Sequence, residues 1–152
     1  MTQEDKNLLL KDLCTRLPYG VKIYFGGIPK LLTSITIKPG YTEILVEGEY
    51  CKAAYCDFIY TYNKKEYLQE EITEKCKPYL RPMSSMTEEE INELILISDT
   101  VLWLGDKRST CILSLEQMDW LNAHHFDYNG LIDKGLAIEV TPDNNPYKNE
   151  NN

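Results

Sequence analysis

Residues 34–50 read SITIKPGYTEILVEGEY, and polar and apolar side chains alternate in two runs within them. The first run is Ser34 to Ile37, and the Lys38-Pro39-Gly40 sequence that follows is typical of a turn. The second run is Thr42 to Glu47, and Gly48 marks a bend or a bulge after it. Because this alternation buries one face of a strand, it predicts two adjacent antiparallel strands.

The segments on either side extend this pattern. Residues 21–25, VKIYF, indicate a strand that is broken by Gly26-Gly27 and Pro29. Residues 50–62 are rich in aromatic and β-branched side chains, which suit a pleated surface, and indicate one long or two short strands. Short connections between such strands predict an antiparallel meander. The same spacing also permits a compact β-barrel with peripheral helices.

A helix precedes the strands. Thr2 can cap it, and Glu4 and Asp5 favour the positive end of its dipole. Pro18 ends it, because a proline nitrogen cannot donate to the helical hydrogen bonds. The sequence therefore predicts an N-terminal helix over the first seventeen residues.

Two capping boxes predict helices in the second half of the chain. Thr87 with Glu90 starts one, and Ser114 with Gln117 starts the other. On the later helix, the side chains expected to face the core are Leu115, Met118 and Leu121. The sequence does not decide whether residues 64–76 and 97–113 form helices, strands or loops.

These elements together predict an α+β fold. It consists of an N-terminal helix, a small antiparallel sheet and a helical C-terminal half that packs on one sheet face. The length fits a single domain, which we place at residues 1–140. Residues 141–152 are polar with two prolines, and we expect this tail to fray.

The segment DWLNAHHFDYNGLIDKGLA, residues 119–137, is the most suggestive one for chemistry. Its His124, His125 and Asp127 are the candidate catalytic or metal-ligating residues. Metal-binding helices place two histidines four residues apart, whereas adjacent side chains diverge by about 100° around a helix.

A structural role accounts for the same residues. Asp127 can cap a short helix over residues 128–134, and Gly135 can take the left-handed position that ends it. We therefore favour a tight corner between two helices over a metal or acid/base site.

Composition and the N-terminus indicate a reducing compartment. The five cysteines are widely spaced, and only Cys51 and Cys56 lie close together. Zinc sites usually show two such pairs, so we expect reduced thiols and neither a metal nor another cofactor. The start, MTQEDKNLLL, lacks the apolar core of a secretory signal, and no run is long enough to span a membrane. We expect a cytoplasmic protein that does not bind a membrane.

The charge is unevenly distributed. Residues 1–80 carry 11 basic and 11 acidic side chains, whereas residues 81–152 carry 5 basic and 13 acidic ones. Nucleic-acid binding relies on lysine and arginine contacts with phosphates, so the acidic half argues against a DNA or RNA partner. An acidic face can instead meet a basic surface on another protein.

Three segments, NLLLKDLCTRLPYGVKI (7–23), KPYLRPMSSMTEEE (77–90) and DWLNAHHFDYNGLIDKGLAIE (119–139), resemble a family of short proteins. Its members are encoded by prophages and other mobile elements of Bacteroides-type gut bacteria. Residues 24–76 and 91–118 do not share the resemblance. It implies an intracellular protein of a mobile element and assigns no catalytic residue.

Two functions are compatible with these observations. The one we favour is a non-enzymatic accessory or interaction protein of a phage-like element that binds another protein. The alternative is a small metal-dependent or acid/base enzyme that uses His124, His125 and Asp127. Eleven tyrosines and two tryptophans give a slight preference for a homodimer, because aromatic residues are enriched at interfaces.

Overall fold

The fold is α+β, as predicted, in a computed structural model that describes residues 1–38, 41–47, 49–54, 57–62, 65–67, 76–97 and 113–148. The N-terminal half consists of α1 (Gln3–Arg16), η1 (Leu17–Tyr19), β1 (Lys22–Phe25), β2 (Ile28–Lys38), β3 (Tyr41–Val46), β4 (Glu49–Ala54), β5 (Asp57–Tyr62) and β6 (Lys65–Tyr67). The C-terminal half consists of β7 (Tyr79–Pro82), η2 (Met83–Ser85), α3 (Glu88–Ile97), α4 (Leu115–Ala123), β8 (Phe126–Asp127) and β9 (Ile138–Glu139).

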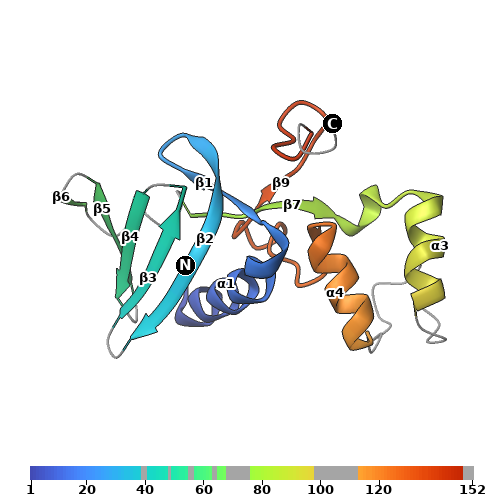
Figure 1. Cartoon of the computed structure of the whole chain (residues 1–152), viewed down its shortest axis with the longest axis horizontal. Coiled ribbons are helices and arrows are strands. Elements are labelled where there is room, and N and C mark those ends of the chain that lie inside the picture. Colours follow the sequence, from blue (N-terminus) through green and yellow to red (C-terminus); the bar gives the residue numbers. More distant parts are fainter. Residues whose placement is uncertain are drawn as a thin grey trace.

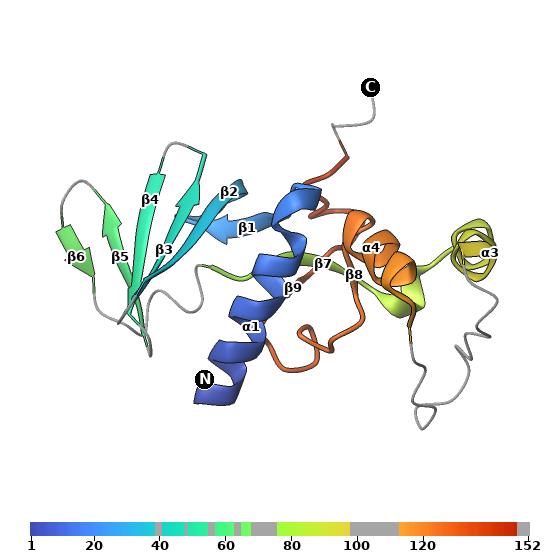
Figure 2. The same cartoon turned by 60° about the horizontal axis from the view of Figure 1, so that its bottom comes forward.

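The molecule is elongated. The larger sheet lies at one end and α3 at the other, with α1 and α4 between them, and β7 runs along the middle (Figure 1). The view in Figure 2 keeps the same order of sheet, α1, α4 and α3. The described helices thus lie in a row beside β7.

The larger sheet is the predicted antiparallel meander. Its order is β1-β2-β3-β4-β5-β6, and each strand pairs with its neighbour in the sequence. Residues 49–54 and 57–62 form two short strands, and residues 65–67 of the segment left open by the sequence form β6. No pairing joins β1 to β6 in the described residues, so the sheet is open and the barrel alternative is wrong.

The predicted break after the first strand is confirmed, because β1 ends at Phe25 and Gly26-Gly27 form the turn, but Pro29 lies inside β2 and not in the break. It is opposite Tyr24, whose N–H points away from β2 and donates to the Lys77 carbonyl at 2.8 Å. Tyr24 and Pro29 are therefore a pair that exchanges no backbone hydrogen bonds, and the missing N–H of Pro29 is not needed there. On the other side of β2, the pairing with β3 extends only to Leu32, so the missing amide hydrogen breaks no ladder.

A second sheet, which the sequence did not reveal, organises the C-terminal half. Its order is β8-β7-β9, and both pairs are parallel. Arg81 is opposite Phe126, and Tyr79 is opposite Ile138. The C-terminal half is therefore built from α3, α4 and this short sheet.

Two clusters of buried apolar side chains form the core. The larger lies between α1, the sheet and β7, and its members include Leu9, Leu13, Ile23, Ile44, Val46, Leu80 and Leu136. The smaller joins α3, α4 and β8 through Leu94, Leu121 and Phe126. None of the described helices is both long and apolar enough to cross a bilayer.

Both capping boxes of the second half are confirmed. In the first, the Glu90 N–H donates to the Thr87 hydroxyl at 3.2 Å, and the Thr87 N–H donates back to the Glu90 carboxylate at 2.8 Å. Ser114 and Gln117 make the same reciprocal pair at the start of α4. The N-terminal helix also begins with such a box, formed by Thr2 and Asp5.

α4 buries only part of the face formed by Leu115, Met118 and Leu121. Leu121 is fully buried, but Leu115 is 66% exposed, and the fully buried residue near the start of α4 is Gln117. Burial of this amide is tolerated because its Nε2–H donates to the Leu94 carbonyl of α3 at 3.2 Å. Gln117 thus caps its own helix and links it to the neighbouring one.

The described cysteines agree with reduced thiols. Cys76 is buried and Cys14 is partly exposed, and neither forms a disulfide. Burial raises the pKa of the Cys14 thiol, which keeps it protonated and unreactive at neutral pH. The side chains of Cys51, Cys56 and Cys111 lie outside the described residues.

Candidate functional site

Asp127 caps a tight loop, although the helix predicted after it is absent. Its Oδ1 accepts the Leu131 N–H at 2.9 Å, and its Oδ2 accepts the Ile132 N–H at 2.7 Å. Residues 128–137 form turns, because Gly130 has a φ of 71°, which a right-handed helix excludes. The prediction of a helix over 128–134, and hence of a corner between two helices, is wrong.

The predicted left-handed conformation of Gly135 at the end of that segment is nevertheless confirmed. Gly135 has a φ of 67°, and its N–H donates to the Ile132 carbonyl at 2.9 Å. The Leu136 N–H donates to the Leu131 carbonyl at 2.8 Å, and the Leu136 side chain is buried. These bonds form the Schellman motif that normally ends a helix, here closing a single loop.

His124 is the C-cap of α4, and its ring packs back on its own helix. The imidazole stacks on the Trp120 indole with a centroid distance of 3.9 Å. Its Nδ1 lies 2.8 Å from the Trp120 carbonyl oxygen, which can only accept, so Nδ1 carries a hydrogen. This hydrogen bond fixes the ring orientation and leaves Nε2 for another group.

His125 follows in a left-handed conformation with a φ of 58°. Its carbonyl accepts the Arg81 N–H at 2.8 Å, which anchors the corner to β7. Its ring stacks on Tyr147 with a centroid distance of 3.9 Å and an interplanar angle of 11°. The two adjacent histidines therefore pack on different partners.

Tyr147 belongs to the segment predicted to be a frayed tail. Its hydroxyl accepts the Lys22 N–H and donates to the Tyr79 carbonyl, both at 3.0 Å. The Lys22 ammonium donates to the Pro146 carbonyl at 3.0 Å. These bonds hold residues 141–148 against β1 and β7, whereas residues 149–152 lie outside the described residues.

The histidine corner opens onto a cleft of about 690 Å³. Both histidines of the chain line it, and Asp127 does not. Its walls come from η1, β7, the end of α4 and the C-terminal segment. The side chains that matter for its chemistry are Tyr19, Arg81, His124, His125, Tyr147 and Lys148.

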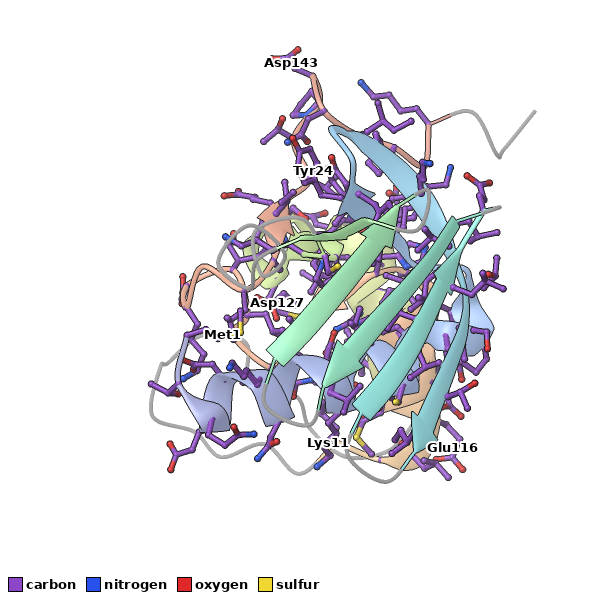
Figure 3. The ribbon with its side chains drawn as sticks, turned by 90° about the vertical axis from the view of Figure 1, so that its left-hand side faces the viewer. Met1, Lys11, Tyr24, Glu116, Asp127 and Asp143 are labelled. Carbon is purple, nitrogen blue, oxygen red and sulfur yellow. The ribbon has the colours of Figure 1, made fainter. Side chains whose placement is uncertain are left out.

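Figure 3 shows the molecule from the end at which the larger sheet lies. Asp127 is labelled beside the left edge of the strands, at about mid-height in the view. Asp143 of the C-terminal segment and Lys11 of α1 lie at opposite ends of the view. Asp127 is only 8% exposed, which agrees with its role in the loop.

Arg81 is the cationic anchor of the cleft. Its guanidinium donates to both carboxylate oxygens of Glu90, at 2.7 and 2.9 Å, and to the Ser85 carbonyl at 3.4 Å. It lies 4.1 Å from the centroid of the Phe126 ring. The hydrogen bonds from Arg81 hold the pKa of Glu90 below its ordinary value. Arg81 is therefore fixed in orientation, with its side chain 25% exposed.

Sequence reasoning missed Arg81, since residues 77–90 contain no local pattern that singles it out. Its partners on β8 and α3 become visible only once β7 pairs with β8. Tyr19, at the end of η1, was missed for the same reason. Its hydroxyl donates to Asp119 Oδ1 at 2.8 Å, and this hydrogen bond raises the pKa of Tyr19.

The described residues contain no group of three or more histidine, cysteine, aspartate or glutamate side chains that could hold a metal ion. No family model, curated protein or solved structure matches the chain. The properties of the cleft therefore rest on its own geometry.

Proposed function

We propose that this chain is a non-enzymatic interaction protein that binds another protein through the cleft at the histidine corner. The resemblance of three segments to prophage and mobile-element proteins supports an accessory role in such an element. The bound protein would contact η1, β7, the end of α4 and residues 145–148.

The observation that carries the proposal is how the candidate catalytic residues are used. Acid/base and nucleophilic sites need a carboxylate or similar group that orients the imidazole. Here both oxygens of Asp127 accept backbone N–H groups of its own loop. The Nδ1 of His124 is held by a backbone carbonyl. Asp127 is thus occupied in its own loop, and His124 keeps only Nε2 for another group.

The cleft has the composition of a protein-binding surface. Tyrosine and arginine are enriched among the residues that contribute most binding energy at interfaces. Tyr19, Tyr147 and Arg81 line the cleft together, and each is fixed by hydrogen bonds. Side chains that are ordered before binding lose less entropy when a partner docks.

The test compares two lysine variants in a capture experiment. The chain is immobilised through its N-terminus and exposed to a lysate of a Bacteroides-type gut bacterium. Lys148→Glu reverses a charge in the cleft, and Lys134→Glu reverses the charge of another exposed lysine that does not line it. We expect a host protein to be retained by the wild type and by Lys134→Glu and to be lost with Lys148→Glu. Capture that is identical for all three chains rules out the cleft.

The alternative, a small metal-dependent or acid/base enzyme, predicts a different result. Elemental analysis of protein purified without a histidine tag would then show stoichiometric zinc, manganese or iron. That result would replace the interaction proposal with a metal-dependent activity at the corner.

A further inference from the structure

Large apolar side chains are exposed where the last turn of α3 meets the start of α4. Leu96 is 85% exposed, Leu115 is 66% exposed and Ile95 is 42% exposed. The two helices meet at this corner, because the Gln117 side chain donates to the Leu94 carbonyl at 3.2 Å. Figures 1 and 2 both place α3 at the end of the molecule opposite the larger sheet. Single exposed apolar residues are common, whereas a group of them at one corner is typical of a surface that another molecule covers.

Leu96 lies on the side of α3 that faces away from the core. Successive residues advance by about 100° around a helix, which places Glu89, Glu93 and Leu96 on one side and the fully buried Leu94 on the other. Glu89 and Glu93 are both exposed and are four residues apart, a spacing at which like charges repel each other. Neither the exposed leucine nor this like-charged pair stabilises the chain by itself. A partner that covers the leucine and supplies positive charge would offset both costs.

The charge around these apolar side chains is negative throughout. Residues 83–97 and 113–123 contain six acidic side chains and no basic one. Glu90 is paired with Arg81, but the side chains of four other glutamates are exposed, namely Glu88, Glu89, Glu93 and Glu116. Residues 98–112, which connect the two helices, contain two acidic and two basic side chains, so their formal charge is zero and the excess remains.

We propose that this corner is a docking surface for a basic amphipathic helix of another protein. The α3 surface, as we call it, consists of Glu89, Glu93, Ile95, Leu96, Leu115 and Glu116. An amphipathic helix presents a stripe of apolar side chains that is flanked by charged ones, and such helices bind by laying this stripe on exposed apolar surface. Lysine or arginine side chains beside the stripe would face the glutamates of the α3 surface.

Charge distinguishes this partner from other occupants of the same surface. A second copy of the chain would place glutamates opposite glutamates, and an acidic segment would be repelled in the same way. A nucleic acid would bring phosphates to a surface without lysine or arginine. A basic helix is the occupant that matches both the apolar side chains and the charge.

The proposal goes beyond the proposed function, because none of the six residues lines the cleft at the histidine corner. Binding at the α3 surface should therefore not change with Lys148→Glu, and capture through the cleft should not change with Leu96→Ser. Each proposal can fail while the other holds.

The test measures how a designed peptide binds to the whole chain. The probe is a fluorescent helix of about four turns, made only of leucine and lysine, with all leucines on one face. Two control peptides carry glutamine or glutamate in place of every lysine. In fluorescence anisotropy titrations we expect the lysine peptide to bind and saturate, the glutamine peptide to bind more weakly and the glutamate peptide not to bind.

Variants of the chain then locate the binding. Leu96→Ser and Glu93→Lys should each weaken binding of the lysine peptide on the order of tenfold, because they remove apolar contact and reverse a charge. The matched controls are Ile28→Ser, at an apolar residue of β2 that is 55% exposed, and Glu139→Lys, at an exposed residue of β9. Both should leave binding unchanged. All four side chains are exposed, so each variant should unfold at the urea concentration of the wild type.

The proposal is overturned if the lysine peptide does not bind or if the glutamate peptide binds equally well. Equal binding by Leu96→Ser and Ile28→Ser would also overturn it, since the peptide would then follow the overall negative charge of the chain. Sedimentation equilibrium tests the remaining occupant. A wild-type dimer that Leu96→Ser converts to a monomer would assign the α3 surface to a second copy and overturn the proposal, whereas a wild-type monomer supports a partner of different sequence.

Discussion

Asp12 and Arg16 form an ion pair of 2.7 Å on α1, and both side chains are completely shielded from solvent. The pair also ties α1 to the loop that follows α4. Arg16 Nη2 donates to the Phe126 carbonyl, and Asn129 Nδ2 donates to Asp12 Oδ1, both at 2.8 Å. Arg16 Nη1 is buried without a hydrogen-bond partner among the described residues. Among the residues that the structure describes, Asp12 is therefore the one carboxylate that balances the charge of Arg16.

Removal of that carboxylate should be strongly destabilising. Asp12→Ala leaves a buried guanidinium without a counter-charge, and we expect it to lower the free energy of unfolding by about 3–5 kcal/mol. Urea denaturation monitored by circular dichroism measures this loss. The double variant Asp12→Leu with Arg16→Met removes both charges and should cost less than the single change. Equal costs would show that packing, and not the unpaired charge, causes the loss.

Asp127 should stabilise the folded state through the two backbone hydrogen bonds that its carboxylate accepts. Asp127→Ala removes both acceptors, and we expect a loss on the order of 2 kcal/mol. Asp127→Asn keeps one carbonyl oxygen, so it should recover only part of this loss. Asp133→Ala, at an exposed residue of the same loop, is the control and should change stability little. The expectation fails if Asp127→Ala unfolds at the same urea concentration as the control.

The left-handed conformation of His125 can be tested with a pair of substitutions. His125→Gly and His125→Ala both remove the ring that stacks on Tyr147, but only alanine keeps a Cβ at a φ of 58°. We expect the glycine variant to be the more stable one by about 1 kcal/mol, as measured by thermal or urea unfolding.

The same pair at His124 is the matched control. This residue has a φ of −95°, where alanine is unstrained and glycine costs more backbone entropy. The order of stability should therefore reverse. An alanine variant that is the more stable one at both histidines would contradict a strained backbone at His125.

The Arg81–Glu90 pair should make stability depend on pH. The hydrogen bonds from Arg81 lower the pKa of Glu90 below its ordinary 4.5, so the unfolded chain binds the proton more readily than the folded one. The contribution of the pair is present above that ordinary value and is lost as the pH falls below it. We expect the wild type to lose more stability than Glu90→Gln between neutral pH and the acid range. Parallel urea titrations at several pH values measure this difference, and identical pH dependences would refute it.

The elements that were predicted correctly are those specified by neighbouring residues. The meander follows from alternation and tight turns, and the helix starts follow from capping boxes whose members are three residues apart. Gly135 was also recognised, because a left-handed glycine at the end of a segment is a local signal.

The features that sequence reasoning missed depend on distant partners. Arg16 and Asp12 are charged residues on the buried face of α1, which is possible only because Phe126 and Asn129 lie against them. Residues 128–134 carry good helix-start and helix-stop residues, but Gly130 adopts a left-handed φ within them. The cleft unites η1, β7, α4 and the C-terminal segment, and no local pattern relates these four.

The parallel pairing of β7 also has a consequence for the kinetics of folding. Every strand of the meander pairs with its nearest neighbour in the sequence, so those hairpins close short loops and can form while the chain is still being synthesised. β7 can pair only with β8 and β9 in its sheet, and these strands are synthesised after α3 and α4. Contacts of such high sequence separation form late and slowly. We therefore expect the docking of residues 126–139 onto β7, which joins the two cores, to follow the formation of the hairpins.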